Sequence, residues 1–155
     1  MPATLAWELR DATVDMGQLT KEYKPVLRLV RELIGVVPNC DNFLEIWPPG
    51  FRTYNLLVPN LFNLPHMLIG QGAPKDLVGL AAYVSSRAAE CMYCSAHTCS
   101  FALRRGASPQ AVAGNYNDVE EAVANLAFAL GRVPTEMTID YIKALEQFLD
   151  PADVE

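Results

Sequence analysis

An all-helical fold is the fold class that the sequence predicts. Apolar residues recur at intervals of three and four along much of the chain, whereas period-two alternation never extends beyond a few residues. Residues that favour helix starts precede several of these stretches, and glycines follow several of them. The 155 residues suffice for one domain whose core needs no disulfide scaffold. We therefore predict a single helical bundle over residues 1–155.

The first part of this domain, residues 1–60, is predicted to hold one helix and a proline-rich segment that wraps the rest. The helix runs from about Thr20 to Ile34, with Pro25 in its first turns and Gly35 after its end. Prolines are frequent between residues 36 and 65, and they predict short helical pieces or loops there and no long helix.

Residues 61–155 are predicted to form the helical core. One helix follows Pro74 and buries Leu77, Leu80, Ala81 and Val84. The next runs from about Cys91 to Arg105, because two arginines close it and Gly106 follows. Later helices are expected to start at Ser108–Pro109, at Asn117 with Glu120 as its capping partner, near Thr138, and at Asp150–Pro151.

Two of these later helices have a predicted apolar face. The helix after Asn117 is expected to end at Gly131 and Pro134. Its inward residues are predicted to be Val119, Ala122, Val123, Leu126, Ala127 and Leu130. The helix near Thr138 is predicted to bury Ile139, Ile142, Leu145 and Leu149.

Composition excludes several classes of partner and setting. The formal charge of −6 and the dispersal of the twelve Lys and Arg residues argue against a nucleic-acid groove. Apolar stretches are interrupted well before the roughly 20 residues that a membrane span needs, so no membrane association is expected. No secretory signal precedes Trp7, and only four cysteines occur, which predicts a reducing, cytoplasmic setting. The partner is then a small molecule or a protein.

The segment CMYCSAHTCSFALRRG, residues 91–106, carries the reactive side chains. Cys91 and Cys94 are expected in the first turn of a helix, where free N–H groups and the helix dipole stabilise a thiolate. Three residues apart, they can also close into a reversible disulfide. His97 lies one turn further on, within predicted reach of Cys94 for proton exchange. The pattern predicts redox chemistry.

Two other interpretations of the motif remain open from the residues alone. The two cysteines can be small buried apolar side chains. They can also bind zinc with His97 and a fourth ligand from Cys40 or Cys99, although structural zinc sites usually draw their second ligand pair from a separate segment. Cys99 is predicted to pack in the core.

From about Leu61 to the end, the chain resembles the superfamily of alkyl hydroperoxide reductase D (AhpD) and carboxymuconolactone decarboxylase, in its Cys-x-x-Cys peroxidase-related branch. The resemblance rests on CMYC, the following HTCSFALRRGAS, the later VEEAVANLAFAL and the helix that starts at a threonine. It implies an AhpD-like helical bundle that forms homo-oligomers through helix packing. Relatives continue into a further helix after this point, which suggests a shortened chain or an apolar surface that a neighbouring subunit covers.

The resemblance also implies the roles of the site residues. Cys94 corresponds to the nucleophile that attacks the peroxide, Cys91 to the cysteine that resolves the sulfenic acid into a disulfide, and His97 to the base. The sequence departs from the family at two places. Thr98 stands at the usual histidine position, and the proton-relay glutamate falls at Gly79. Its substitutes would be Glu90, beside Cys91, or Asp76, one turn before Gly79.

The function that follows is reduction of organic hydroperoxides, with an external dithiol of lipoyl or thioredoxin type resetting the pair and no bound cofactor or metal. One alternative is a non-enzymatic oligomeric or zinc-stabilised module whose Cys and His residues are structural. Another is a carboxymuconolactone decarboxylase-like lyase, for which the sequence offers no dedicated set of residues.

Overall fold

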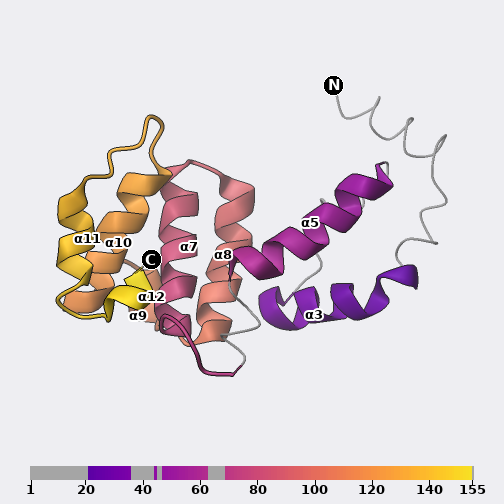
Figure 1. Cartoon of the computed structure of the whole chain (residues 1–155), viewed down its shortest axis with the longest axis horizontal. Helices are drawn as coiled ribbons and strands as arrows, with labels where there is room; N and C mark the ends of the chain where they lie inside the picture. Colours follow the sequence, from indigo (N-terminus) through magenta and orange to yellow (C-terminus); the bar gives the residue numbers. More distant parts are fainter. Residues whose placement is uncertain (1–20, 36–43, 45–46, 63–68, 155) are drawn as a thin grey trace. The chain divides into compact units, whose positions relative to one another are not determined.

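The computed structural model describes residues 21–35, 44, 47–62 and 69–154. The chain divides into two compact units, Met1–Leu64 and Pro65–Glu155, so the division lies near the predicted boundary at residue 60. Every regular element within the described residues is a helix, which confirms the predicted all-helical class (Figure 1). None of these helices is long and apolar enough to cross a membrane.

The first unit contains α3, Lys24–Ile34, and α5, Pro48–Leu61. Helix α3 confirms the predicted N-terminal helix. Gly35 ends it at φ 94°, a left-handed conformation that glycine adopts without steric cost, and its N–H bonds to the Arg31 carbonyl.

Helix α5 shows that the predicted exclusion of a long helix between residues 36 and 65 is wrong. Pro48 and Pro49 occupy its first two positions, where the backbone N–H would have no helical partner in any case. Pro59 lies in the last turn, so it removes a single hydrogen bond near the end of the helix. Phe51 is fully buried against Leu27 and holds the helix in the unit.

The second unit is built on α7, Lys75–Ala88; α8, Met92–Arg105; α10, Asp118–Gly131; and α11, Ile139–Leu145. Figure 1 shows α7 between α8 and α10, with α11 on the far side of α10. Two short helices, α9, Pro109–Val112, and α12, Pro151–Val154, complete it. All six helices were predicted from their capping residues and apolar spacing.

The direction of the helices determines which ends meet. Helices α7 and α8 are antiparallel, because only residues 89–91 separate them. Helix α10 runs parallel to α7, since Leu77 at the start of α7 packs with Ala122, whereas Gly131 at the end of α10 lies against Ser85. The last turns of α7 and α10 and the first turn of α8 therefore lie at the same end of the second unit. We call this end of the second unit the cysteine end.

Two glycines allow α7 to pack closely against both neighbours. A Cβ atom at Gly79 would lie 2.8 Å from the Cα atom of Ala102 in α8, a separation that real side chains do not show. A Cβ atom at Gly131 would lie 2.5 Å from the Ser85 carbonyl oxygen. The absence of a side chain at these positions fixes the spacing of α8, α7 and α10.

Two residues that were predicted to face the core are exposed instead. Leu130 is 53% exposed, because α10 presents alanines, among them Ala124 and Ala127, to the core at α7. Ile139 is 61% exposed at the start of α11, whose buried residue is Leu145. The predicted periodicity was right in both helices, but the position of the buried face depends on the packing partner.

The capping box at the start of α10 supplies a stability prediction. The Asn117 side chain accepts the Glu120 N–H at 3.0 Å, and the Glu120 carboxylate accepts the Asn117 N–H at 2.9 Å. Replacing Asn117 with Ala is expected to lower the free energy of unfolding by about 1 kcal/mol, because the capping oxygen is lost. Urea denaturation measures this. Asn125→Ala, at an exposed position inside the same helix, serves as the control and should be neutral or slightly stabilising.

Candidate redox site at the start of α8

The connection between α7 and α8 places Cys91 at the cysteine end. Helix α7 closes with two hydrogen bonds of a Schellman motif, from the Glu90 N–H to the Arg87 carbonyl at 3.0 Å and from the Cys91 N–H to the Ser86 carbonyl at 3.1 Å. Cys91 then acts as the N-cap of α8, and its sulfur accepts the Cys94 N–H at 3.1 Å. The backbone of Cys91 is thus held by α7 while its side chain caps α8.

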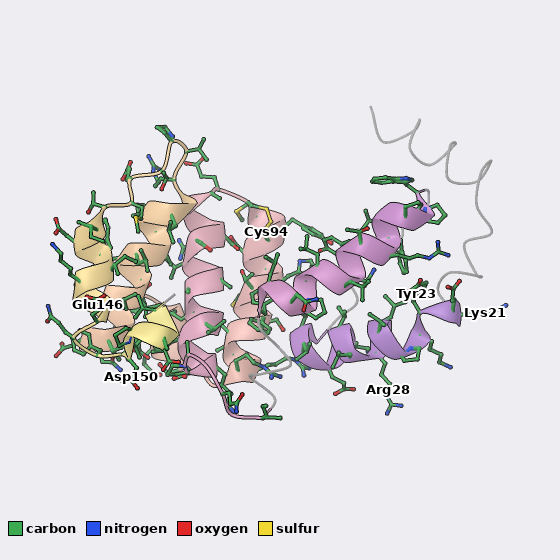
Figure 2. The ribbon with its side chains drawn as sticks, in the orientation of Figure 1. Lys21, Tyr23, Arg28, Cys94, Glu146 and Asp150 are labelled. Atoms are coloured by element: carbon green, nitrogen blue, oxygen red, sulfur yellow. A yellow bond between two sulfur atoms is a disulfide. The ribbon has the colours of Figure 1, made fainter. Side chains whose placement is uncertain are left out.

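A disulfide joins Cys91 and Cys94, whose Cα atoms are 5.2 Å apart (Figure 2). The prediction that both cysteines lie in the first turn needs a one-residue adjustment, because Cys91 precedes the first helical residue. Cys94 is exposed to solvent, and Cys91 is half-buried. A disulfide at an accessible helix start is compatible with a redox enzyme.

The hydrogen bond and the ring contact that the structure gives His97 are both with Tyr93. The His97 Nδ1 atom lies 2.8 Å from the Tyr93 carbonyl oxygen, and the Tyr93 and His97 rings are in contact, with centroids 4.4 Å apart and planes tilted by 52°. Because a carbonyl only accepts hydrogen bonds, this bond places a proton on Nδ1, and a neutral ring of this tautomer accepts at Nε2. Among the described residues, no hydrogen bond links His97 to either sulfur atom.

Thr98, at the position of the family's usual histidine, has a backbone role. Its hydroxyl donates to the Cys94 carbonyl at 2.8 Å, one turn back along α8. This bond is typical of threonine inside a helix and provides no base for a thiol.

Asp76 does not lie near the cysteines. A Cβ atom at Gly106, just beyond the far end of α8, would lie 3.8 Å from the Asp76 Cβ atom. The 14 residues of α8 separate that end from Cys91 by roughly 20 Å at the usual helical rise. Asp76 is therefore too distant to serve as the predicted proton relay, because α7 and α8 are antiparallel.

Glu90 is the acidic residue that adjoins the disulfide. Its side chain is exposed, and its φ is 54°. Among the residues that the structure describes, it is the one residue other than glycine in the left-handed region. A relay role for Glu90 stays a prediction, whereas its strained backbone is a property of the helix connection.

The strain at Glu90 predicts a stabilising substitution. Glu90→Gly is expected to raise the free energy of unfolding by roughly 0.5–1 kcal/mol, because relief of the left-handed strain exceeds the added entropy of the unfolded chain. Glu90→Gln keeps the strain and removes the charge, so it should leave stability nearly unchanged. Urea denaturation of oxidised protein compares them, and equal stability of the Gly and Gln variants would contradict the strain argument.

Of the two cysteines predicted as a fourth zinc ligand, the structure describes one. Cys99 is a free, half-buried thiol, and Cys40 lies outside the described residues. Within the part of the chain that is described, no group of three or more His, Cys, Asp or Glu side chains is arranged to hold a metal ion.

The two residues between the cysteines form an apolar rim of the site. Met92 is 84% exposed and Tyr93 is 44% exposed, so the two residues between the cysteines present apolar surface to solvent. The spacing of four between Tyr93 and His97 was the available signal for their contact, because such residues are neighbours on a helix. This rim makes the surroundings of Cys94 suited to an apolar reactant.

A hollow of about 340 Å³ lies elsewhere, between α11 and α12. Its lining includes Glu146, Asp150 and Asp153. Leu149, also in the lining, packs against the core cluster that includes Leu77 at the start of α7, so the hollow lies away from the cysteine end. The hollow is therefore not part of the site around the Cys91–Cys94 disulfide.

Comparison with known structures agrees with the helical fold. The structure is similar to that of the debrominase Bmp8 in its apo form, with a TM-score of 0.70 and 23% identity. It is also similar to a Bmp8 variant, with a cysteine replaced by alanine, in complex with 2,3,4-tribromopyrrole, with a TM-score of 0.71 and 22% identity. Each match covers 88% of this chain and 75% of the other. No family model and no curated protein matches the chain.

Proposed function

We propose that the protein is an AhpD-like thiol peroxidase that reduces organic hydroperoxides through Cys91 and Cys94. The observation that carries the proposal is the Cys91–Cys94 disulfide at the start of α8, with Cys94 exposed. The sequence resemblance to the AhpD superfamily and the structural likeness to an enzyme support it. Homo-oligomerisation and a cytoplasmic location belong to the same proposal.

In the proposed reaction, the Cys94 thiolate attacks the terminal peroxide oxygen. The O–O bond breaks, the alkoxide takes up a proton to leave as an alcohol, and Cys94 becomes a sulfenic acid. The Cys91 thiolate then attacks the Cys94 sulfur, and hydroxide leaves as water once protonated. An external dithiol reduces the resulting disulfide. The His97 Nε2 atom, free of the Tyr93 contact, is the proposed base after a side-chain rotation or through water.

The apolar rim supports the choice of an organic peroxide. Met92 and Tyr93, which precede Cys94 in the chain, expose apolar surface. Contact of this surface with an alkyl group is favourable, whereas contact with hydrogen peroxide contributes little. Cumene hydroperoxide is therefore expected to react faster than hydrogen peroxide.

Intact mass measurement tests the proposal. Fully reduced protein should lose two hydrogens after one equivalent of cumene hydroperoxide, and peptide mapping should place the new disulfide at Cys91 and Cys94. Native mass measurement of the same sample reports bound metal. Thiols that stay reduced in excess peroxide, or zinc that stays bound to the motif, would contradict the proposal.

A second candidate is thiol-dependent reductive dehalogenation, which the likeness to a debrominase favours. The reaction would replace a carbon–bromine bond with a carbon–hydrogen bond, release bromide and oxidise the dithiol to the disulfide. Incubation of reduced protein with 2,3,4-tribromopyrrole distinguishes the two functions. Dehalogenation is supported over peroxidase activity by two results together. Bromide is released in stoichiometric amount as the disulfide forms, and cumene hydroperoxide leaves the thiols reduced.

A further inference from the structure

We propose that the external reductant attacks the disulfide at Cys94, and that Cys91 leaves as the thiolate. This inference rests on the proposed redox function and deepens it, because it assigns the two sulfur atoms different roles in the reductive half of the cycle. Two independent features of the site carry it: the difference in exposure of the two cysteines and the hydrogen bond to one of them.

Access favours attack at Cys94. Cys94 is an exposed residue, and it lies in the first turn of α8, directly after the exposed apolar residues Met92 and Tyr93. Cys91 is half-buried, and its N–H is bonded to Ser86 in α7. Because thiol–disulfide exchange requires direct approach of the attacking sulfur, we expect the mixed disulfide to form at the more exposed cysteine.

Cys91 is the better leaving group when the disulfide is cleaved. The Cys91 sulfur accepts the Cys94 N–H at 3.1 Å in the oxidised protein. A thiolate at the same position would keep that bond and would gain from the positive end of the α8 dipole. Since exchange is faster when the departing sulfur is the more stable thiolate, cleavage that releases Cys91 has the lower barrier.

A dithiol of lipoyl type can reduce the Cys91–Cys94 disulfide in two exchange steps. One donor thiolate forms a bond to the Cys94 sulfur, and the Cys91–Cys94 bond breaks to leave the Cys91 thiolate. The second donor thiolate then attacks the donor's own sulfur in the mixed disulfide. Cys94 is released as a thiolate, the donor becomes a cyclic disulfide, and the two protons of the donor pass to the protein thiols or to solvent.

The same arrangement suits the oxidative half of the proposed cycle. The exposed Cys94 meets the hydroperoxide, and the stabilised Cys91 thiolate stands next to it as the resolving nucleophile. One sulfur therefore exchanges groups with both external reactants, while the other opens and closes the protein disulfide. Reductant and peroxide would use the same apolar rim in turn.

Glutathione, a monothiol, is the probe for the site of attack. Oxidised full-length protein carrying Cys99→Ser is mixed with excess glutathione, quenched with acid within seconds and mapped by peptide mass spectrometry. At least about ten times more adduct is expected on Cys94 than on Cys91, the factor that corresponds to 1.4 kcal/mol in the competing barriers. Adduct that is mainly on Cys91, or equally on both, would overturn the inference.

A second measurement decides the outcome if the mixed disulfide is too short-lived to capture. Cys94→Ser and Cys91→Ser, each in the Cys99→Ser background, leave one thiol of the pair for alkylation by iodoacetamide. The alkylation rate of Cys91 should reach half its maximum about one pH unit or more below that of Cys94. Equal or reversed midpoints would overturn the leaving-group assignment. Failure of dithiothreitol to reduce the native disulfide would instead contradict the proposed function itself.

Discussion

Cys94→Ser is expected to lower the turnover of cumene hydroperoxide by on the order of a thousand-fold or more, because the attacking nucleophile is removed. Because Cys94 is exposed, its replacement removes no core contact, and the variant is expected to stay folded. The measurement is the rate of peroxide loss in the presence of dihydrolipoamide, with the free energy of unfolding of the reduced variant checked in parallel.

Cys91 and Cys99 supply the matched variants. Cys91→Ser should consume one equivalent of peroxide and stop at a Cys94 sulfenic acid, which dimedone labels. Cys99→Ser should keep turnover within about twofold, because Cys99 is a free thiol outside the disulfide. Full activity in Cys94→Ser, or a dimedone adduct on Cys91 in that variant, would reverse the assigned roles of the two cysteines.

The ends of the helices could be predicted from the sequence because capping is local. Asn117 and Glu120 form the expected capping box, and Gly106 ends α8 in a left-handed conformation. The donors and acceptors that these motifs satisfy lie within a few residues of the side chain that caps them. The N-cap role of Cys91 was within one residue of the prediction for the same reason.

The features that sequence reasoning missed depend on partners far along the chain. The separation of Asp76 from Cys91 follows from the antiparallel pairing of α7 and α8, and the exposure of Leu130 follows from the side of α10 that meets α7. Helix α5 was missed because prolines were counted without regard to position, although those at its first residues cost the helix nothing.

Gly79 has a structural meaning that the family pattern alone did not provide. From the sequence, it is the position at which the resemblance places the proton-relay glutamate of the AhpD superfamily. In the structure, it is buried where α7 crosses α8, and a Cβ atom there would lie 2.8 Å from the Cα atom of Ala102. A backbone atom in a packed helix cannot move aside as the end of a flexible side chain can. The position therefore excludes glutamate in this chain.

Gly79→Glu is accordingly expected to lower the free energy of unfolding by at least about 3 kcal/mol, because it combines overpacking with the burial of an unpaired carboxylate. Gly79→Ala isolates the steric part and should cost roughly 1–3 kcal/mol. Asn125→Glu adds a carboxylate at an exposed position of α10 and should change stability by less than about 0.5 kcal/mol. Urea denaturation of the three variants gives the comparison.

Activity measurements on the same variants address the proton pathway. Gly79→Glu should have no more peroxidase activity than Gly79→Ala. Position 79 lies against Ala102, which is 11 residues beyond Cys91 along α8, roughly 16 Å at the helical rise. A carboxylate there is therefore distant from Cys91. A stable Gly79→Glu protein with faster turnover would show that α7 and α8 can separate and that the position can reach the thiols. Without such a gain, His97 Nε2 and solvent are left to move the proton in the proposed reaction.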